Sequence, residues 1–301
     1  MHDQLAQGGI AASRFLRGAL SPYDAAMKIA AVQMVSTPDW PANRDSAARL
    51  IAQTAAAGAT LVLLPEYFCI MGRRDTDKLA LAEAPGTTAA SPIQAFLSAA
   101  AREHGLWLVG GTLPLATASP AQALNRCCVY GPYGEEAAHS DKVHLFAFDN
   151  GRESYDEGRT LLAGSAPVAL QAGPLPNGEK LRVGLSICYD LRFPELYRAL
   201  MAPPCDVLCV PAAFTHTTGQ AHWELLLRAR AVENQCYVLA AAQGGTHPNG
   251  RRTWGHSMVV GPWGEVIDVL PEGEGFVLAD LDLEHLAQVR AQLPALRHRR
   301  L

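Results

Sequence analysis

Short apolar runs alternate along this chain with longer segments in which apolar residues recur at helical spacing. Runs of Val, Leu and Ala that are bounded by Gly, Pro or Asp are typical of buried strands. They predict strands at residues 28–35, 60–65, 106–112, 125–132, 136–142, 182–188, 206–212, 236–242, 254–261, 265–270 and 275–281. The helical spacing predicts helices at residues 41–57, 91–104, 194–201, 219–234 and 282–292.

This order of elements predicts one α/β domain over residues 27–301, with buried strands and helices outside them. No low-complexity linker divides it. The segments 131–134 and 261–264 share the pattern Gly-Pro-aromatic-Gly, which predicts two hairpin turns and hints at internal pseudo-symmetry. Residues 1–26 lack the apolar stretch of a secretory signal, and we expect them to be a dispensable leader or the result of an upstream start codon.

The composition excludes several classes of protein. The 301 residues are 49% hydrophobic and 18% charged, which is too apolar for a disordered chain. The 25 basic and 29 acidic residues give a net charge of −4, so no excess of positive charge is available to bind nucleic acid. The longest apolar runs are too short to cross a bilayer. We therefore expect neither nucleic acid nor a membrane as a partner.

The seven cysteines indicate the compartment. Their number is odd, their spacing is irregular and no C-x-x-C pair occurs. The cysteines are Cys69, Cys127, Cys128, Cys188, Cys205, Cys209 and Cys236. A disulfide framework or a zinc site would require regular spacing, so we expect free thiols in the cytoplasm. The chain also has no other metal-ligand pattern, and we expect it to need no metal or cofactor.

Cys188 differs from the other thiols in its sequence context. Residues 181–187 alternate like a strand, and Pro194 begins the next helix, so Cys188 falls in a turn between the two. A nucleophile on such a turn projects into a cleft beside the backbone N–H of the next residue, which is the geometry that acyl transfer requires. The simpler interpretation is one more buried cysteine.

A thiol needs a base, and the sequence offers two kinds. A Cys–His pair would use one of the histidines at positions 144, 216, 222 and 256. Alternatively, Glu66 ends one buried run and Lys142 ends another. Alone, each would usually be a solvated residue at a strand end. Together with Cys188 they provide the base, cation and thiol of an amide hydrolase.

Three segments carry a family resemblance. Residues 65–68 (PEYF), 141–146 (DKVHLF) and 188–196 (CYDLRFPEL) resemble, in that order, the motifs of the nitrilase superfamily of carbon–nitrogen hydrolases. The resemblance implies an α/β fold of four layers, αββα. It also implies a catalytic triad of Glu66, Lys142 and Cys188. A second active-site glutamate follows the lysine motif in many members, and the resemblance indicates Glu153 for this position.

Further segments indicate which branch of the superfamily the chain resembles. Residues 211–215, 218–231, 233–238 and 255–260 resemble the Nit branch of the superfamily. Residues 240–243, His247 and the C-terminal segment are more similar to amidases that act on deaminated glutathione than to omega-amidases. The resemblance implies hydrolysis of that amide to 2-oxoglutarate and cysteinylglycine through a cysteine thioester.

Alternatives remain open at this point. An omega-amidase acting on 2-oxoglutaramate or 2-oxosuccinamate, another amidase of the superfamily, and a nitrile hydrolase share the triad. A papain-like Cys–His peptidase would depend on a histidine. A catalytically silent interaction module would have lost a triad residue, and all three are present.

The implied substrate is a small anionic amide, which needs cations and hydrogen-bond donors around the thiol. The backbone N–H of Tyr189 is the expected oxyanion donor, and Arg192 and Thr215 are expected to bind substrate. Tyr67 and Phe214 are expected to form the cleft walls. The ordinary alternative for Arg192 is an ion pair with a carboxylate such as Glu195.

The apolar stripe of helix 219–234 is typical of a face packed on a core. In members of the family this helix contributes to a dimer face. The resemblance therefore implies a homodimer or a higher homo-oligomer.

Overall fold

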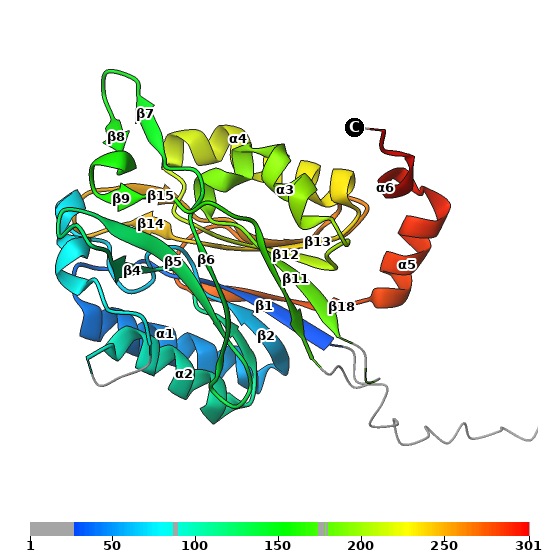
Figure 1. The fold of residues 1–301 in the computed structure, drawn as a ribbon, viewed down its shortest axis with the longest axis horizontal. Helices are drawn as coiled ribbons and strands as arrows, with labels where there is room; N and C mark the ends of the chain where they lie inside the picture. Colours follow the sequence, from blue (N-terminus) through cyan, green and yellow to red (C-terminus); the bar gives the residue numbers. More distant parts are fainter. Residues whose placement is uncertain (1–26, 87–89, 174–177, 179, 301) are drawn as a thin grey trace, which may run out of the picture.

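Two β-sheets stack face to face at the centre of the molecule, and helices cover both outer faces (Figure 1). The computed structural model describes residues 27–86, 90–173, 178 and 180–300. The predicted leader, residues 1–26, lies outside the described residues.

The first sheet has the strand order β18-β1-β2-β3-β5-β4, and β6 and β9 also pair with β5. Strands β1, β2 and β3 are parallel, whereas β18 and β5 are antiparallel to their neighbours. The strands are β1 (Met27–Gln33), β2 (Ala59–Leu63), β3 (Trp107–Val109), β4 (Leu113–Ala116), β5 (Ala123–Tyr130), β6 (Glu136–Asp141), β9 (Leu161–Leu162) and β18 (Gly275–Leu281).

The second sheet repeats this arrangement. Its order is β10-β11-β12-β13-β16-β17, with β11, β12 and β13 parallel and the outer strands antiparallel. The strands are β10 (Val168–Ala172), β11 (Leu181–Leu185), β12 (Val207–Ala212), β13 (Tyr237–Ala242), β16 (Ser257–Val260) and β17 (Val266–Leu270). The turn at 131–134 joins β5 to β6, and the turn at 261–264 joins β16 to β17. Both predicted hairpins and the pseudo-symmetry are confirmed.

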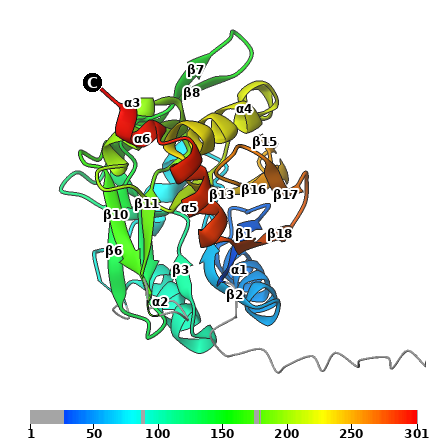
Figure 2. The ribbon, with the colours of Figure 1, turned by 90° about the vertical axis from the view of Figure 1, so that its right-hand side faces the viewer.

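The helices complete the four layers. α1 (Trp40–Ala56) and α2 (Pro92–His104) cover the first sheet, and α3 (Pro194–Leu200) and α4 (His216–Asn234) cover the second (Figures 1 and 2). α5 (Leu283–Gln292) and α6 (Ala295–His298) follow β18 at the C-terminal end. The predicted αββα sandwich is confirmed. No helix within the described residues is long and apolar enough to span a bilayer.

The core divides along these layers. Ile29, Leu61 and Leu63 of the first sheet belong to the same buried cluster as Val183 and Leu239 of the second. On the other face of the first sheet, side chains such as those of Val32, Val62 and Leu64 pack against α1 and α2. Period-two alternation therefore separates the two packing faces of each strand.

Strand directions determine where the loops gather. β6 is antiparallel to β5, which is antiparallel to β3, so β6 runs in the same direction as the parallel strands. An isolated parallel bridge between Met34 and Gln243 joins the carboxyl ends of β1 and β13. The carboxyl ends of β2, β6, β11 and β12 consequently open on one region, where α/β sheets bind their ligands.

Several boundaries differ from the sequence prediction, and two of these differences have a clear local cause. The predicted strand 254–261 is divided, because Gly255 and His256 both adopt positive φ and separate β15 (Arg252–Trp254) from β16. Helix α4 begins at His216 rather than at residue 219, because the Thr215 hydroxyl accepts a hydrogen bond from the backbone N–H of Thr218 and caps an earlier turn. This places Thr215 at the mouth of the site described next.

Candidate active site

Three strand ends bring Glu66, Lys142 and Cys188 together. Glu66 lies in the turn after β2, Lys142 directly follows β6, and Cys188 begins a short 3-10 helix after β11. All three side chains are buried, with exposed fractions of 1%, 0% and 7%. They come from positions far apart in the sequence, and only the convergence of the strand ends makes them neighbours.

The ammonium of Lys142 lies between two carboxylates. Its Nζ is 2.9 Å from Glu66 Oε1 and 2.7 Å from Glu157 Oε2. The amide of Asn125 donates a further hydrogen bond of 3.0 Å to Glu66 Oε1, and the backbone N–H of Phe146 donates one of 2.7 Å to Glu157 Oε2. These contacts hold both carboxylates and the ammonium in fixed positions.

The charges of this cluster stabilise one another. Burial alone would lower the pKa of Lys142, but the charges of Glu157 and Glu66 raise it above its ordinary value. Burial alone would raise the pKa of Glu157, but the charge of Lys142 and its hydrogen bonds lower it overall. Lys142 is therefore a permanent cation at neutral pH, suited to stabilising negative charge rather than to accepting a proton.

Cys188 has the backbone of a projecting nucleophile. Its φ is +49°, a left-handed conformation that a residue other than Gly adopts only under constraint. Burial, the charge of Glu66 and a hydrogen bond to Glu66 raise the pKa of the Cys188 thiol well above its ordinary value, and only Lys142 acts in the opposite direction. The resting group is therefore a neutral thiol beside a carboxylate that can accept its proton.

Asp190 fixes the turn that carries Cys188. One of its carboxylate oxygens accepts a hydrogen bond of 2.9 Å from the backbone N–H of Ile187. The other lies 2.8 Å from the backbone nitrogen and 2.7 Å from Nδ1 of His144. Since His144 is two residues from Lys142, one side chain joins the thiol turn to the lysine turn.

The turn that carries Glu66 is clamped from three directions. The Thr112 hydroxyl accepts from the backbone N–H of Tyr67, and the Gln243 amide donates 3.0 Å to the carbonyl oxygen of Glu66. Gly111 has a φ of +58°, and a Cβ at this position would lie 2.1 Å from the carbonyl oxygen of Pro65. Only glycine fits there, so the close approach of two loops helps to position Glu66.

The residues expected to bind substrate surround the thiol. Tyr189, Arg192, Phe214 and Thr215 line one small pocket with Cys188, Glu66 and Glu157. The guanidinium of Arg192 lies over the rings of Phe214 and Tyr189 and is 3.3 Å from Nδ1 of His222. The alternative of an ion pair with Glu195 is not what the structure shows, so the charge of Arg192 faces the pocket.

The structure corrects one expectation. Glu153, expected as the second carboxylate of the site, lies on the outer hairpin of β7 (Ala147–Asp149) and β8 (Ser154–Asp156), where it accepts a hydrogen bond of 3.2 Å from Thr217. Glu157 occupies the place beside Lys142 instead, and it also accepts a 3.0 Å hydrogen bond from the hydroxyl of Tyr67.

The reason for the correction is local and could have been found in the sequence. The pair Asn150–Gly151 is a strong hairpin-turn signal. It places the following Glu153 near the tip of the hairpin, which projects away from the body of the molecule in Figure 1. The returning strand then brings Glu157 back to the sheet, next to Phe146.

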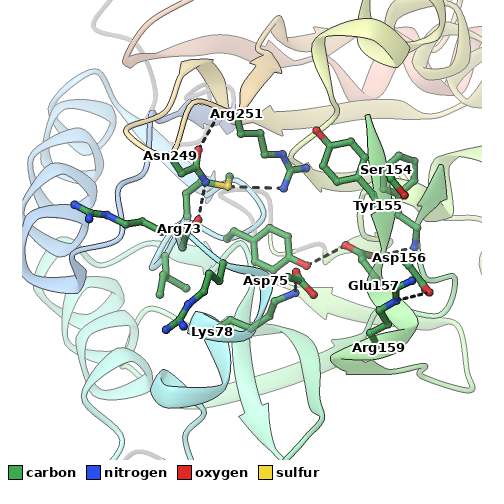
Figure 3. Close-up of a pocket in the computed structure, with 16 residues that line it drawn as sticks. Arg73, Asp75, Lys78, Ser154, Tyr155, Asp156, Glu157, Arg159, Asn249 and Arg251 are labelled. Atoms are coloured by element: carbon green, nitrogen blue, oxygen red, sulfur yellow. Dashed lines mark hydrogen bonds and ion pairs between the residues drawn. The ribbon is translucent and has the colours of Figure 1, made fainter. Parts of the chain in front are cut away.

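A second and larger cavity adjoins the thiol pocket. It has a volume of about 470 Å³ and shares Phe146, Glu157 and Arg251 with the pocket of Cys188. Figure 3 shows its lining: Arg251 enters from one side, Asp75 and Lys78 from another, and Tyr155 and Glu157 from a third. Tyr67 lines this outer cavity, and its hydroxyl donates a hydrogen bond to Glu157.

No histidine lines the pocket of Cys188 among the described residues. His144 is held by Asp190 and stacks on Phe193, with ring centroids 3.6 Å apart. The nearest titratable partners of the thiol are Glu66, Lys142 and Glu157. This arrangement does not support a papain-like Cys–His pair.

Comparisons with known proteins agree with this geometry. The carbon-nitrogen hydrolase family model matches residues 28–291. A deaminated glutathione amidase of Synechocystis is 41% identical, covering 93% of this chain and 99% of the relative. The omega-amidase NIT2 of Xenopus tropicalis is 37% identical, covering 92% and 96%. The crystal structure of Saccharomyces cerevisiae Nit3, of branch 10 of the nitrilase superfamily, has a TM-score of 0.81 at 29% identity, covering 94% and 100%.

The electrostatics of the thiol lead to a first prediction. In Glu66→Gln, the pKa of Cys188 should fall below that of the unsubstituted protein, because a negative charge that disfavours the thiolate is removed while Lys142 remains. Titration of thiolate ultraviolet absorbance, with the matching Cys188→Ala protein subtracted, measures this shift. Glu83→Gln, at a buried glutamate outside this cluster, should leave the pKa unchanged. An equal or higher thiol pKa in Glu66→Gln would contradict the arrangement.

Proposed function

The chain belongs to the carbon–nitrogen hydrolase family, and from that premise we propose that it is an amidase that hydrolyses deaminated glutathione at Cys188. The observation that carries this proposal is one buried thiol in a pocket, hydrogen-bonded to a carboxylate that a buried ammonium contacts at 2.9 Å. Because the family hydrolyses carbon–nitrogen bonds and a relative at 41% identity is named an amidase, a linear amide is the appropriate substrate class.

Acylation begins from the resting state, in which Cys188 is a neutral thiol and Glu66 is a carboxylate. Glu66 accepts the thiol proton as the sulfur attacks the carbonyl carbon of the amide. Lys142 and the backbone N–H of Tyr189 stabilise the oxyanion that develops; the loss of one such donor typically costs about 3–4 kcal/mol. Glu66 then returns the proton to the amine as the C–N bond breaks, because an unprotonated amide nitrogen is too basic to leave. A thioester on Cys188 remains.

Deacylation reuses the same groups. A water molecule enters where the amine has left, and Glu66 removes its proton as it attacks the thioester. We assign the positioning of this water to Glu157, in place of Glu153, because Glu157 lies at the pocket and is fixed by Lys142 and Phe146. The C–S bond breaks, the thiol recovers its proton from Glu66, and the carboxylic acid is released.

The acyl part of the substrate matches the inner pocket. The 2-oxoglutaryl group ends in a 2-oxo acid carboxylate, and the guanidinium of Arg192 lies in the pocket without a carboxylate partner among the described residues. The hydroxyls of Thr215 and Thr218 lie 2.9 Å apart on the same wall and supply further hydrogen-bond donors. A relative named deaminated glutathione amidase, at 41% identity, supports the same substrate.

The compartment and the assembly complete the proposal. All seven cysteines are free, which fits a reducing cytoplasm. We also propose a homodimer through α4 and the adjacent turn 261–264. Leu225 and Val232 on α4 and Trp263 in the turn are 67%, 51% and 60% exposed, and Arg228 links the two segments by a 2.8 Å hydrogen bond to Gly264. Such an exposed apolar group is typical of an interface.

One experiment tests the proposed function. The purified protein should hydrolyse deaminated glutathione to 2-oxoglutarate and cysteinylglycine, and rapid quenching should show a 2-oxoglutaryl adduct on Cys188 by mass spectrometry. The Cys188→Ala protein should show neither adduct nor turnover. The simple amide 2-oxoglutaramate has the same acyl group, so it should give the same adduct with a lower kcat/KM. A much higher kcat/KM for 2-oxoglutaramate would identify an omega-amidase instead.

Substitution of the two glutamates of the hairpin segment gives a test variant and its matched control. Glu157→Gln should lower kcat about 100-fold or more and allow the thioester to accumulate, because the positioning of the attacking water is lost. Glu153→Gln should leave kcat close to that of the unsubstituted protein, since the Glu153 carboxylate lies on the outer hairpin, where it accepts a hydrogen bond from Thr217. Steady-state kinetics and intact-protein mass measure both effects. Equal losses in the two variants, or a loss without accumulation of thioester, would contradict the assigned role of Glu157.

The proposed dimer can be tested with the pseudo-symmetry as its control. Trp263→Glu should shift the protein toward the monomer, because a charge would be buried in the interface. Tyr133→Glu changes the equivalent residue of the other hairpin, which is 85% exposed, and should leave the assembly intact. Size-exclusion chromatography with light scattering gives the mass of each protein. A monomeric unsubstituted protein, or dissociation by both changes, would contradict this interface.

A further inference from the structure

The outer cavity has no role in the hydrolysis of a simple amide. Its volume of about 470 Å³ is in the range of sites that hold a small organic molecule, about 300–1,000 Å³. A primary amide releases ammonia, which needs no such space. A substituted amide releases a larger amine, which must lie on the open side of the thiol pocket, and the outer cavity adjoins that pocket through Phe146, Glu157 and Arg251.

The charges that line this cavity are mostly compensated. Lys78 Nζ is 2.6 Å from Asp75, and Arg159 Nε is 3.1 Å from Asp156. Arg73 also lines the cavity, but its side chain is exposed and extends away from the centre of the cavity in Figure 3. Arg251 is therefore the cation that remains at the boundary with the thiol pocket.

Arg251 lacks a carboxylate partner among the described residues. Its guanidinium contacts the carbonyl oxygen of Ala213 at 3.1 Å and the sulfur of Met71 at 3.9 Å, and it lies 5.2 Å from the ring centroid of Tyr155. Its Nε–H is buried and has no hydrogen-bond partner. A buried donor on a charged group is costly to leave unpaired, so the position favours an anion.

The backbone holds Arg251 in this position without help from a ligand. Its N–H donates to the side chain of Asn249, which in turn donates to the carbonyl oxygen of Gly72. Its carbonyl oxygen accepts from the N–H of His247, and the ring of His247 contacts the carbonyl oxygen of Ser36 and the Thr253 hydroxyl. The loop is thus attached to the segment after β1 and to β15, and the guanidinium is preorganised at the mouth of the site.

We propose that the outer cavity binds the leaving amine of the substrate and that Arg251 pairs with a carboxylate on that amine. The inference rests on the proposed function for the identity of the acyl group. Arg192 then binds the carboxylate of the acyl part and Arg251 a carboxylate of the amine part, on either side of the bond that breaks. An amino acid or short peptide with a free C-terminus is the class of amine that this arrangement selects.

Two changes to the substrate test this assignment. Deaminated glutathione and 2-oxoglutaramate share the acyl group and differ only in the amine, and a third amide, with the C-terminal glycine as its carboxamide, removes only the distal charge. The unsubstituted enzyme should prefer the carboxylate to the carboxamide by about 10- to 100-fold in kcat/KM, the range expected for a charge-assisted hydrogen bond. A preference below threefold, with turnover of both amides, would overturn the inference without affecting the proposed function.

The matching enzyme variants are Arg251→Met and Arg102→Met, the latter at an exposed arginine of α2 that lines neither cavity. Arg251→Met should lower kcat/KM for deaminated glutathione by about the same 10- to 100-fold factor and abolish the preference over the carboxamide. Its activity on 2-oxoglutaramate should be retained, which also shows that the variant is folded. Arg102→Met should behave as the unsubstituted enzyme. An equal loss on all three amides would overturn the role of Arg251, whereas an unsubstituted enzyme that hydrolyses none of them would refute the proposed function itself.

Discussion

The ammonium of Lys142 is completely buried, and its two carboxylate partners are the constraint on which the site depends. Removing a charge from water costs several kcal/mol, and only close opposite charges with further hydrogen bonds recover that cost. Glu66 and Glu157 meet this condition, and each is held by a second donor, from Asn125 or Phe146. The cluster therefore has one low-energy arrangement. The Cys188 thiol lies beside charged groups whose positions are fixed by these contacts.

The same cluster explains why the resting thiol is protonated without being inert. Burial and the nearby charge of Glu66 disfavour the thiolate, so little free thiolate exists before substrate binds. In the proposed acylation, attack on a carbonyl carbon moves the negative charge from sulfur to oxygen, away from Glu66 and toward the fixed positive charge of Lys142. The electrostatic field is thus better matched to the transition state than to the resting enzyme, which is how preorganised groups lower a barrier.

The duplicated architecture distributes the chemistry over both halves. The first half supplies Glu66 and Lys142, at the ends of β2 and β6, and the second supplies Cys188, after β11. Gln243 connects them, because its side chain bonds to Ser36 and to the backbone of Glu66. The second half also supplies Arg192 and Arg251, on which the proposed recognition of the two ends of the substrate depends. Neither half alone contains a complete site.

Much of this protein could be predicted from the sequence, because apolar runs and turn residues act locally. Most of the longer strands and helices, the two hairpins and the segments that carry Glu66, Lys142 and Cys188 follow from patterns within a few residues of each. The short strands β4, β7, β8 and β9 and the edge strand β10 were not predicted. The Asn150–Gly151 turn signal is enough to place Glu153 near a hairpin tip, but the contact of Glu157 with Lys142 depends on the path of the β7–β8 hairpin in the folded chain. The role proposed for Arg251 depends on its buried Nε–H, which has no hydrogen-bond partner in the folded chain. Local pattern determines which elements form, whereas the burial of a charge and the identity of its neighbours depend on contacts between distant segments, which only the folded chain decides.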